Sequence, residues 1–531
     1  MKKLTLLLLA FLTLSPLLAQ DVNKKILNWY NGAKYGMNTD LAYAKLLAGK
    51  KSEPVIVAVI DSGVDIEHED LQGSIWVNED EIPGNGIDDD NNGYIDDING
   101  WNYLGNKDGE NINDVRLELA RIYAKMKLTY EGKKHGDLTP EQQEKFAYYK
   151  EIEDIIQSER TYAQKELDDL SYTTKMISEG HEKMVEKFDE NYTMDQLKSV
   201  KDDPELGEAA SNLITFEKIG LGYHDYQEFI KYYKDILDFN YNPDIDPRAE
   251  VIGDDVSDLS DLDYGNNDVE GPDAGHGTHC AGIIAATRNN GIGNDGVADN
   301  VKIMSLRAVP NGDEWDKDIA LAIRYAIDNG AKVINMSFGK AYSIYPEMVM
   351  EAFQYAEEKG VLLVHGAGNE AQDNDESSNF PSSKYEGMEE KFSNWIEVGA
   401  STRYKKAKIK KGYLIRDGLA ADFSNYGNEM VDVFAPGLEI YSCTPNNTYD
   451  IYDGTSMAAP MVAGLAALIK SYYPNLTMFE IRDIIFESIQ IIDRMTPLPG
   501  DPGQAASFDD LCVQAGIVNA YNAILLAENK Q

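Results

Sequence analysis

The chain carries the stretch VIVAVIDSGV at residues 55–64. Six apolar, mostly β-branched residues followed by Asp61 and a Ser-Gly turn are typical of a buried strand that ends at a turn. Catalytic and binding side chains gather at the carboxyl ends of parallel strands. Asp61 is therefore a candidate functional residue at the end of a strand, and the nearby Asp65 is its local competitor.

The same pattern recurs further along the chain. We predict buried strands and amphipathic helices in alternation, with strands at 301–306, 333–336, 361–364, 396–400 and 430–435 and helices at 315–329 and 348–359. Repeated strand–helix units predict an α/β fold in which a parallel β-sheet is flanked by helices on both faces.

A second motif, GTSMAAP at residues 454–460, places Ser456 at the start of a predicted helix. We expect Pro460 in the first helical turn, where few backbone donors are needed. A serine hydroxyl is a poor nucleophile alone, so such a site requires a base and a group that orients the base. The candidate base is His276, which lies in the glycine-containing stretch GHGTHCAG at residues 275–282.

Asp61, His276 and Ser456 follow one another in the chain order of subtilisin, and their three motifs resemble those of the subtilisin-like serine peptidases (subtilases). The resemblance implies that Asp61 orients His276, that His276 acts as general base, and that Ser456 attacks the scissile carbonyl. It also implies that Asn369, in the stretch VHGAGN at residues 364–369, donates to the oxyanion together with the Ser456 N–H.

The resemblance covers residues 55–103 and residue 251 onward, and it also predicts where substrate binds. An extended protein or peptide substrate would pair with Ser337, Phe338 and Gly339, which follow the strand at 333–336. Ala367 and Gly368 would form another wall of the primary pocket. The implied activity is that of a serine endopeptidase.

The spacing of the motifs predicts the domain organisation. Asp61 and His276 are 215 positions apart, where compact subtilases have a few tens. We therefore predict a subtilase catalytic domain at 55–107 and 247–531, interrupted by a mainly helical, acidic insertion at 108–246. Capping-box patterns at 139–142 and 193–196 and apolar residues at three- and four-residue spacing predict long helices there.

The first residues predict export. Lys2 and Lys3 precede an apolar run at 4–18 and a candidate cleavage site at Ala19, so residues 1–19 resemble a signal peptide and 20–54 form an N-terminal lead-in. The run is too short to span a bilayer comfortably. We expect a periplasmic or secreted protein without a membrane anchor. The formal net charge of -42 argues against nucleic acid as a partner.

An acidic stretch predicts a metal. Residues 78–105 hold eight Asp or Glu residues and no Lys or Arg, and DDDNNGYID at residues 88–96 matches the first part of a calcium loop. Position 12 of that loop is Asn99 instead of glutamate. We predict a structural calcium ion and no organic cofactor, with the ligands Asp88, Asp90, Asn92, Tyr94 and Asp96.

Two other function classes fit parts of the sequence. A catalytically silent binding protein with a subtilase fold would use the helical insertion as its interaction surface, but all the motif residues of the triad are present. An esterase of another fold would carry Gly-x-Ser-x-Gly, which GTSMA lacks. Cys280 is interpreted as a buried packing residue, with a mercurial-sensitive thiol near His276 as the alternative.

Overall fold

The computed structural model of the chain describes residues 25–218, 222–410 and 413–530. Within these residues the chain forms two compact units. A helical unit spans Asp114–Asp246, and a sheet unit contains the remaining described residues on either side of it. The helical unit begins six residues after the predicted start of the insertion. The predicted signal peptide lies outside the described residues.

The described part of the sheet unit is built on a nine-stranded sheet. All neighbouring strands pair in parallel except β12 and β15, which are antiparallel. From edge to edge the strands are β12 (Gln490–Ile491), β15 (Gly516–Ile517), β9 (Val433–Pro436), β6 (Trp395–Ser401), β5 (Leu362–Gly366), β4 (Val333–Met336), β1 (Val55–Asp61), β3 (Val301–Arg307) and β2 (Gly100–Asn102). The predicted α/β fold is confirmed.

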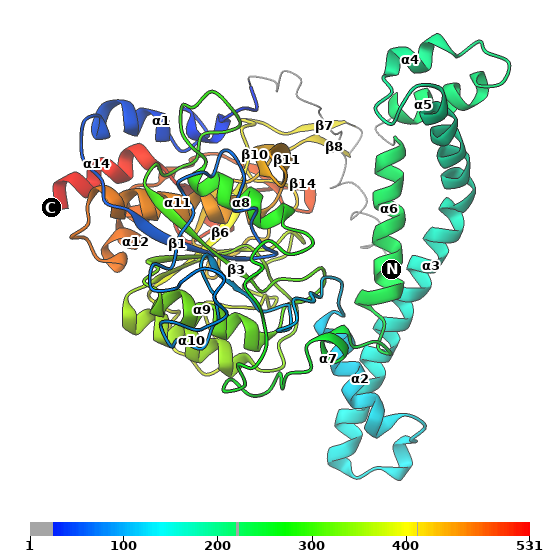
Figure 1. Ribbon diagram of the computed structural model, residues 1–531, viewed down its shortest axis with the longest axis horizontal. Coiled ribbons are helices and arrows are strands. Elements are labelled where there is room, and N and C mark those ends of the chain that lie inside the picture. Colours follow the sequence, from blue (N-terminus) through cyan, green and yellow to red (C-terminus); the bar gives the residue numbers. More distant parts are fainter. Residues whose placement is uncertain (1–24, 219–221, 411–412, 531) are drawn as a thin grey trace. The chain divides into compact units, whose positions relative to one another are not determined.

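Helices cover both faces of the sheet (Figure 1). Successive side chains of a strand point to opposite faces, so Val57 and Val59 of β1 join one core and Ala58 and Ile60 join the other. The first core includes α8 (Gly275–Ala285), α11 (Thr455–Tyr472), α12 (Met478–Glu487) and α14 (Ala520–Lys530), and the second includes α9 (Asp316–Asp328) and α10 (Pro346–Lys359). A strand buried on both faces must be apolar throughout, which explains the unbroken run at 55–60.

The described part of the lead-in belongs to the sheet unit. It contains a 3-10 turn at Trp29–Asn31, α1 (Thr39–Ala42) and a π-helical turn at Tyr43–Leu47. Tyr30 and Met37 are fully buried in the core that α11 also joins, and the Tyr30 hydroxyl donates to the Asp295 carbonyl at 2.9 Å. The lead-in therefore helps to close one face of the sheet.

Smaller elements complete the sheet unit. They are three two-stranded sheets and two short helices: β7 (Lys408–Lys410) with β8 (Tyr413–Arg416), β10 (Ile440–Thr444) with β11 (Thr448–Tyr452), β13 (Thr496–Leu498) with β14 (Asp501–Ala506), α7 (Pro247–Val251) and α13 (Phe508–Leu511).

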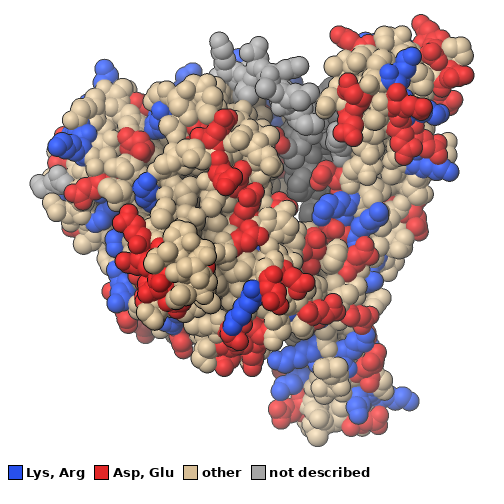
Figure 2. Space-filling model, in the orientation of Figure 1, with Lys and Arg blue, Asp and Glu red and all other residues tan. Residues whose placement is uncertain are grey.

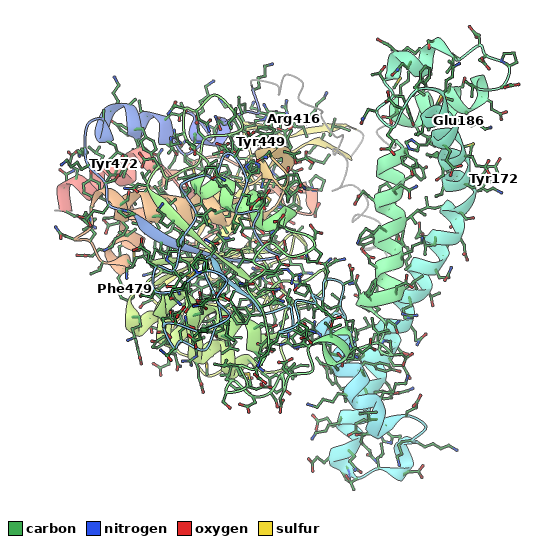
Figure 3. The ribbon with its side chains drawn as sticks, viewed as in Figure 1. Tyr172, Glu186, Arg416, Tyr449, Tyr472 and Phe479 are labelled. Carbon is green, nitrogen blue, oxygen red and sulfur yellow. The ribbon has the colours of Figure 1, made fainter. Side chains whose placement is uncertain are left out.

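The helical unit is organised around one long helix, α3 (Pro140–Lys187). Its N-terminus has the predicted capping box between Thr139 and Gln142, with proline at the first helical position. The other α-helices described in this unit are α2 (Glu118–Tyr130), α4 (Met194–Ser199), α5 (Gly207–Lys218) and α6 (Tyr223–Asp235), with a 3-10 turn at His135–Asp137 and a π-helical turn at Ile236–Asn240. α6 runs beside α3, as Figure 1 shows, whereas Tyr172 of α3 is 78% exposed and projects into solvent (Figure 3).

The surface reflects the acidic composition. Figure 2 shows acidic side chains scattered over the visible face of each unit, with basic side chains among them. None of the helices in the described ranges combines the length and the apolar character that crossing a bilayer requires.

Candidate active site

Asp61 is the last residue of β1, between β3 and β4 in the sheet. Its side chain is 2% exposed. The Oδ1 atom accepts a hydrogen bond from the Ser62 N–H at 2.8 Å and lies 2.7 Å from Nδ1 of His276. The carboxylate therefore lies at the carboxyl end of a central strand, where the sequence predicts it.

His276 is the second residue of α8. Because Nδ1 faces the Asp61 carboxylate, this nitrogen carries a proton and Nε2 is the unprotonated nitrogen of the neutral ring. Burial opposes protonation of His276, but the charge of Asp61 and the hydrogen bond to it outweigh burial and raise the pKa of the ring. The side chain is 38% exposed, so the ring remains accessible from one side.

Gly277 allows α8 to approach the end of β1. A Cβ atom at this position would lie 2.1 Å from the Gly63 carbonyl oxygen and 3.0 Å from Cβ of Asp61. Any larger residue would therefore separate His276 from Asp61. The local sequence does not indicate this role of Gly277, because the role depends on a contact between residues more than 200 positions apart.

Ser456 is the second residue of α11. Its hydroxyl donates to the Ser337 carbonyl at 3.2 Å, and it makes no hydrogen bond to His276 in the described structure. The Cys280 thiol links the two segments: its sulfur lies 3.4 Å from the Ser456 carbonyl oxygen and, together with ligand atoms of Asp61 and His276, forms a cluster within 4.8 Å. The three motifs therefore meet in one place.

Pro460 does not lie in the first turn of α11, which corrects the prediction. The helix begins at Thr455, so Pro460 is its sixth residue, and the N–H that it lacks would have donated to the Ser456 carbonyl. That carbonyl instead accepts from the Ser337 hydroxyl at 2.9 Å and the Cys280 thiol. Because of the proline, the Ser456 carbonyl is available to bond to the segment after β4 and to α8.

Asn369 lies in the loop after β5 with its amide oriented by Thr455. Its Oδ1 atom accepts from the Thr455 N–H at 2.9 Å and the Thr455 hydroxyl at 3.1 Å, which leaves Nδ2 as the outward donor. A methyl group added to Gly454 would lie 3.5 Å from the Ser456 nitrogen and 3.7 Å from Asn369 Nδ2. The two donors therefore border the same small space.

The predicted substrate-binding residues lie at the ends of two adjacent strands. Ser337, Phe338 and Gly339 follow β4, and Ala367 and Gly368 follow β5. The Ala367 carbonyl is held by three side-chain amides, from Asn374 (2.9 Å), Asn379 (3.0 Å) and Asn425 (3.0 Å). The Gly368 N–H donates to the Thr455 hydroxyl at 3.1 Å, so this segment is fixed to the helix that carries Ser456.

The acidic loop gathers a different set of carboxylates from the predicted one. Ligand atoms of Glu81, Asp90 and Asp97 lie within 4.8 Å of one another. Asn92 is adjacent, because its amide nitrogen is 3.0 Å from both Asp90 and Asp97. Of the predicted ligands, Asp90 belongs to the cluster and Asn92 contacts it.

The carboxylates of Asp88 and Asp96 are not part of this cluster and accept hydrogen bonds from backbone N–H groups of the loop. The Asp88 carboxylate accepts from the N–H groups of Asn92 and Gly93, and that of Asp96 accepts from Asn85 and Gly86. The Tyr94 ring is buried against Trp101 and Tyr325. Sequence spacing could not identify Glu81, because its approach depends on the folding of the whole loop.

Comparisons with known proteins identify the family to which the chain is similar. The family model described as "Subtilase family" matches residues 52–508. The chain is 37% identical over 285 residues to the "Thermophilic serine proteinase" of Bacillus sp. (strain AK1), which covers 53% of this chain and 58% of the relative.

Two further relatives carry similar names. "Thermitase" of Thermoactinomyces vulgaris is 40% identical over 199 residues (37% of this chain, 61% of the relative). The "Cell wall-associated protease" of Bacillus subtilis (strain 168) is 35% identical over 264 residues (49% and 26%). The chain spans less than two thirds of the length of each of these relatives.

Proposed function

Because the chain belongs to the subtilase family, we propose that it is an exported serine endopeptidase with an Asp61–His276–Ser456 triad and Asn369 in the oxyanion hole. The observation that carries the proposal is the 2.7 Å contact between Asp61 and His276 beside a serine at a helix N-terminus. A buried carboxylate that fixes the tautomer of a histidine prepares its other nitrogen to accept a proton.

The first step is acylation. An N–H group of the bound peptide takes the place of the Ser456 hydroxyl at the Ser337 carbonyl, and the hydroxyl turns to Nε2 of His276. The oxygen attacks the scissile carbonyl carbon while its proton passes to Nε2. The negative charge that develops on the carbonyl oxygen is stabilised by the Ser456 N–H and Asn369 Nδ2.

The second step restores the enzyme. His276 gives its proton to the leaving amine as the peptide C–N bond breaks, which leaves an ester on Ser456. A water molecule then attacks the ester, its proton passes to His276, and collapse of the second tetrahedral intermediate returns that proton to Ser456. Asp61 stays ionised throughout and orients the ring.

We also propose that the acidic loop binds calcium, with Glu81, Asp90 and Asp97, whose carboxylates cluster, among its ligands. Three carboxylates in close proximity suit a hard cation that prefers oxygen. Asp97 is fully buried, and burial raises its pKa to about 6 in spite of hydrogen bonds from Tyr325 and Asn92. A bound cation would offset the mutual repulsion of these groups and would hold the loop that leads into β2.

Export is proposed from residues 1–19, whose composition is that of a signal peptide. One relative is named for an association with the cell wall. N-terminal sequencing of the protein recovered from cell-free fractions is expected to begin after Ala19. Recovery of the intact N-terminus from the cytoplasm alone would contradict export.

A fluorophosphonate probe tests the proposed activity. The folded wild type is expected to be labelled and to cleave casein at internal bonds, whereas Ser456→Ala should do neither. Ser257→Ala, which changes an exposed serine of the same unit, is the matched control and should behave as wild type. Absence of labelling in a folded wild type would favour the silent binding protein instead.

A further inference from the structure

His365, one residue before the end of β5, is a buried histidine that the proposed reaction does not use. Its side chain is fully buried, with Nε2 2.7 Å from the Phe338 carbonyl oxygen and Nδ1 3.0 and 3.1 Å from the two carboxylate oxygens of Glu397.

Both partners of this ring are acceptors. A neutral imidazole has a single N–H, so the His365–Glu397 pair must hold one additional proton to make both contacts. His68, another fully buried histidine, shows the contrast. One of its nitrogens accepts from the Asp70 N–H and the other faces the Thr448 carbonyl, so its neutral form satisfies both contacts.

The Phe338 carbonyl controls the direction of a neighbouring N–H. The C=O of Phe338 and the N–H of Gly339 belong to one planar trans peptide unit and point in opposite directions. Because His365 holds the carbonyl, the Gly339 N–H points away from His365. Gly339 is exposed, and its N–H makes no hydrogen bond to any residue that the structure describes.

Ser337 indicates which side faces the substrate. Its carbonyl accepts from the Ser456 hydroxyl at 3.2 Å, so it faces the proposed nucleophile, while the next carbonyl along the chain faces His365. Alternate carbonyls of an extended segment point to opposite sides. The Gly339 N–H therefore lies on the same side as the Ser337 carbonyl.

We propose that His365 is a positioning residue that holds the Phe338 carbonyl and thereby presents the Ser337 carbonyl and the Gly339 N–H to the backbone of an extended peptide substrate. This inference rests on the proposed peptidase function. His365 itself does not contact the substrate; it orients the segment 337–339, which does.

A network of buried groups holds the Glu397 carboxylate in place. Trp395 Nε1 donates to it at 2.7 Å, and the Glu397 N–H donates to Asp432 at 2.8 Å. Asp432 in turn pairs with Lys391 at 3.2 Å. Glu314 is a further acidic group near His365, and Lys340 bonds to its carbonyl and to Asp316.

These charges determine the direction of the pH dependence. Burial alone would lower the pKa of His365, but the charge of Glu397 and the hydrogen bonds to Glu397 and Phe338 raise it. The additional proton is therefore present at low pH and is lost as pH rises through the raised pKa. Above this pKa the ring can no longer make both hydrogen bonds, to Phe338 and to Glu397, and substrate binding should weaken.

Steady-state kinetics with a chromogenic tetrapeptide anilide test the inference. Wild-type KM is expected to rise as pH increases through the raised pKa of His365, while kcat does not fall with it. At pH values below that pKa, His365→Gln should raise KM about tenfold, the size of one charged hydrogen bond, and it should abolish the rise of KM with pH. Glu397→Gln should move the rise to lower pH, and the control His68→Gln should leave it unchanged.

The outcomes separate this inference from the function on which it rests. A wild type without Ser456-dependent turnover would remove the proposed function. Turnover with a KM that stays flat to alkaline pH, or a folded His365→Gln variant with wild-type KM, would overturn the role of His365 alone. If His365→Gln does not fold, the dependence of KM on pH in the wild type and in Glu397→Gln tests the role of His365. Binding of the same peptide to Ser456→Ala across pH should follow the KM profile.

Discussion

His276 sets the acid limit of the proposed activity. Its raised pKa means that the ring is charged, and unable to accept the Ser456 proton, until the pH exceeds that value. We expect kcat/KM to fall as pH drops through this pKa. Asp61→Asn should move the acid limb to lower pH, because it removes the charge that favours the protonated ring, and should lower kcat about 10⁴-fold. The measurement is kcat/KM against pH.

Asp65 provides the matched control for Asp61. It is also buried, but its oxygens accept from the N–H groups of Glu67 and Asn446 and do not contact His276. Asp65→Asn should therefore leave the acid limb in place even if it lowers stability. An acid limb that moves equally in both variants would contradict the assignment of Asp61 as the partner of His276.

Asn369 is expected to act on the transition state more than on substrate binding. Asn369→Ala removes the outward amide and should lower kcat about 10²–10³-fold with little change in KM, the cost of one lost oxyanion donor. Asn329→Ala, at the C-terminal end of α9, is the control and should keep wild-type kinetics. A large KM effect with unchanged kcat would assign Asn369 to ground-state binding instead.

At the scale of elements, the loop before β2 is expected to depend on a cation. When the free cation concentration is 100 times the Kd of the site, binding adds about 2.7 kcal/mol to the free energy of unfolding. A chelator should therefore lower the Tm of the wild type. Asp97→Asn and Glu81→Gln should each have a lower Tm and a smaller response to the chelator. Calorimetry with and without chelator provides the measurement.

Asp80 serves as the control for this loop, because it is an exposed acid of the same stretch. Asp80→Asn should keep both the Tm and the full chelator response. If the wild type shows no response to chelation, the loop is held by its own hydrogen bonds and the calcium proposal is wrong.

A buried network of ion pairs holds α7, the helix that follows the helical unit in the chain. Arg248 of α7 is 2% exposed and pairs with Asp254 at 2.7 Å and Asp318 at 2.5 Å, and Lys317 also bonds to Asp254 at 2.8 Å. Arg248→Met should lower the free energy of unfolding by about 3–5 kcal/mol, because it leaves the buried Asp318 carboxylate without its guanidinium partner. Denaturant unfolding measures this loss.

An exposed pair gives the comparison. Arg324 and Glu351 are 3.9 Å apart on the surface, so Arg324→Met should change the free energy of unfolding by less than about 1 kcal/mol. Similar losses in the two variants would show that burial of the Arg248 network contributes nothing specific.

At the scale of the whole molecule, the helical unit is a compact unit inserted in the chain between two parts of the sheet unit. Its ends are held together within the unit, with Arg116 and Asp246 2.5 Å apart and the Leu117 N–H donating to Asn240. Every strand of the nine-stranded sheet lies outside it. We therefore expect that a short linker between Asn113 and Pro247 leaves a folded sheet unit.

Two hypotheses describe what the helical unit does: it restricts substrate entry, or it assists folding of the chain. Excision should then raise the cleavage of folded proteins relative to a tetrapeptide anilide, or lower the refolding yield. Ser456→Ala in the excised form controls for contaminating proteases. If excision changes neither quantity, both hypotheses are wrong.

Short-range patterns were sufficient to predict the parallel sheet, the helices on its two faces and the capped start of α3. The apolar run at 55–60 and the helix starts at Thr139 and Thr193 depend only on neighbours a few positions away. The motifs that place Asp61, His276, Ser456 and Asn369 are equally local. Their chemical roles came from a family resemblance, which carries information that periodicity does not contain.

Contacts between distant residues were settled by tertiary structure alone. The carboxylate cluster required Glu81 to approach Asp97, and Tyr325, 228 positions away, to bond to Asp97. The pairing of His365 with Phe338 and Glu397 depends on which strands are neighbours, and the role of Pro460 depends on where α11 begins. The periodicity of apolar residues along a chain indicates which faces of its helices and strands are buried. It does not indicate the partner of a buried polar group, because that partner depends on how distant segments pack together.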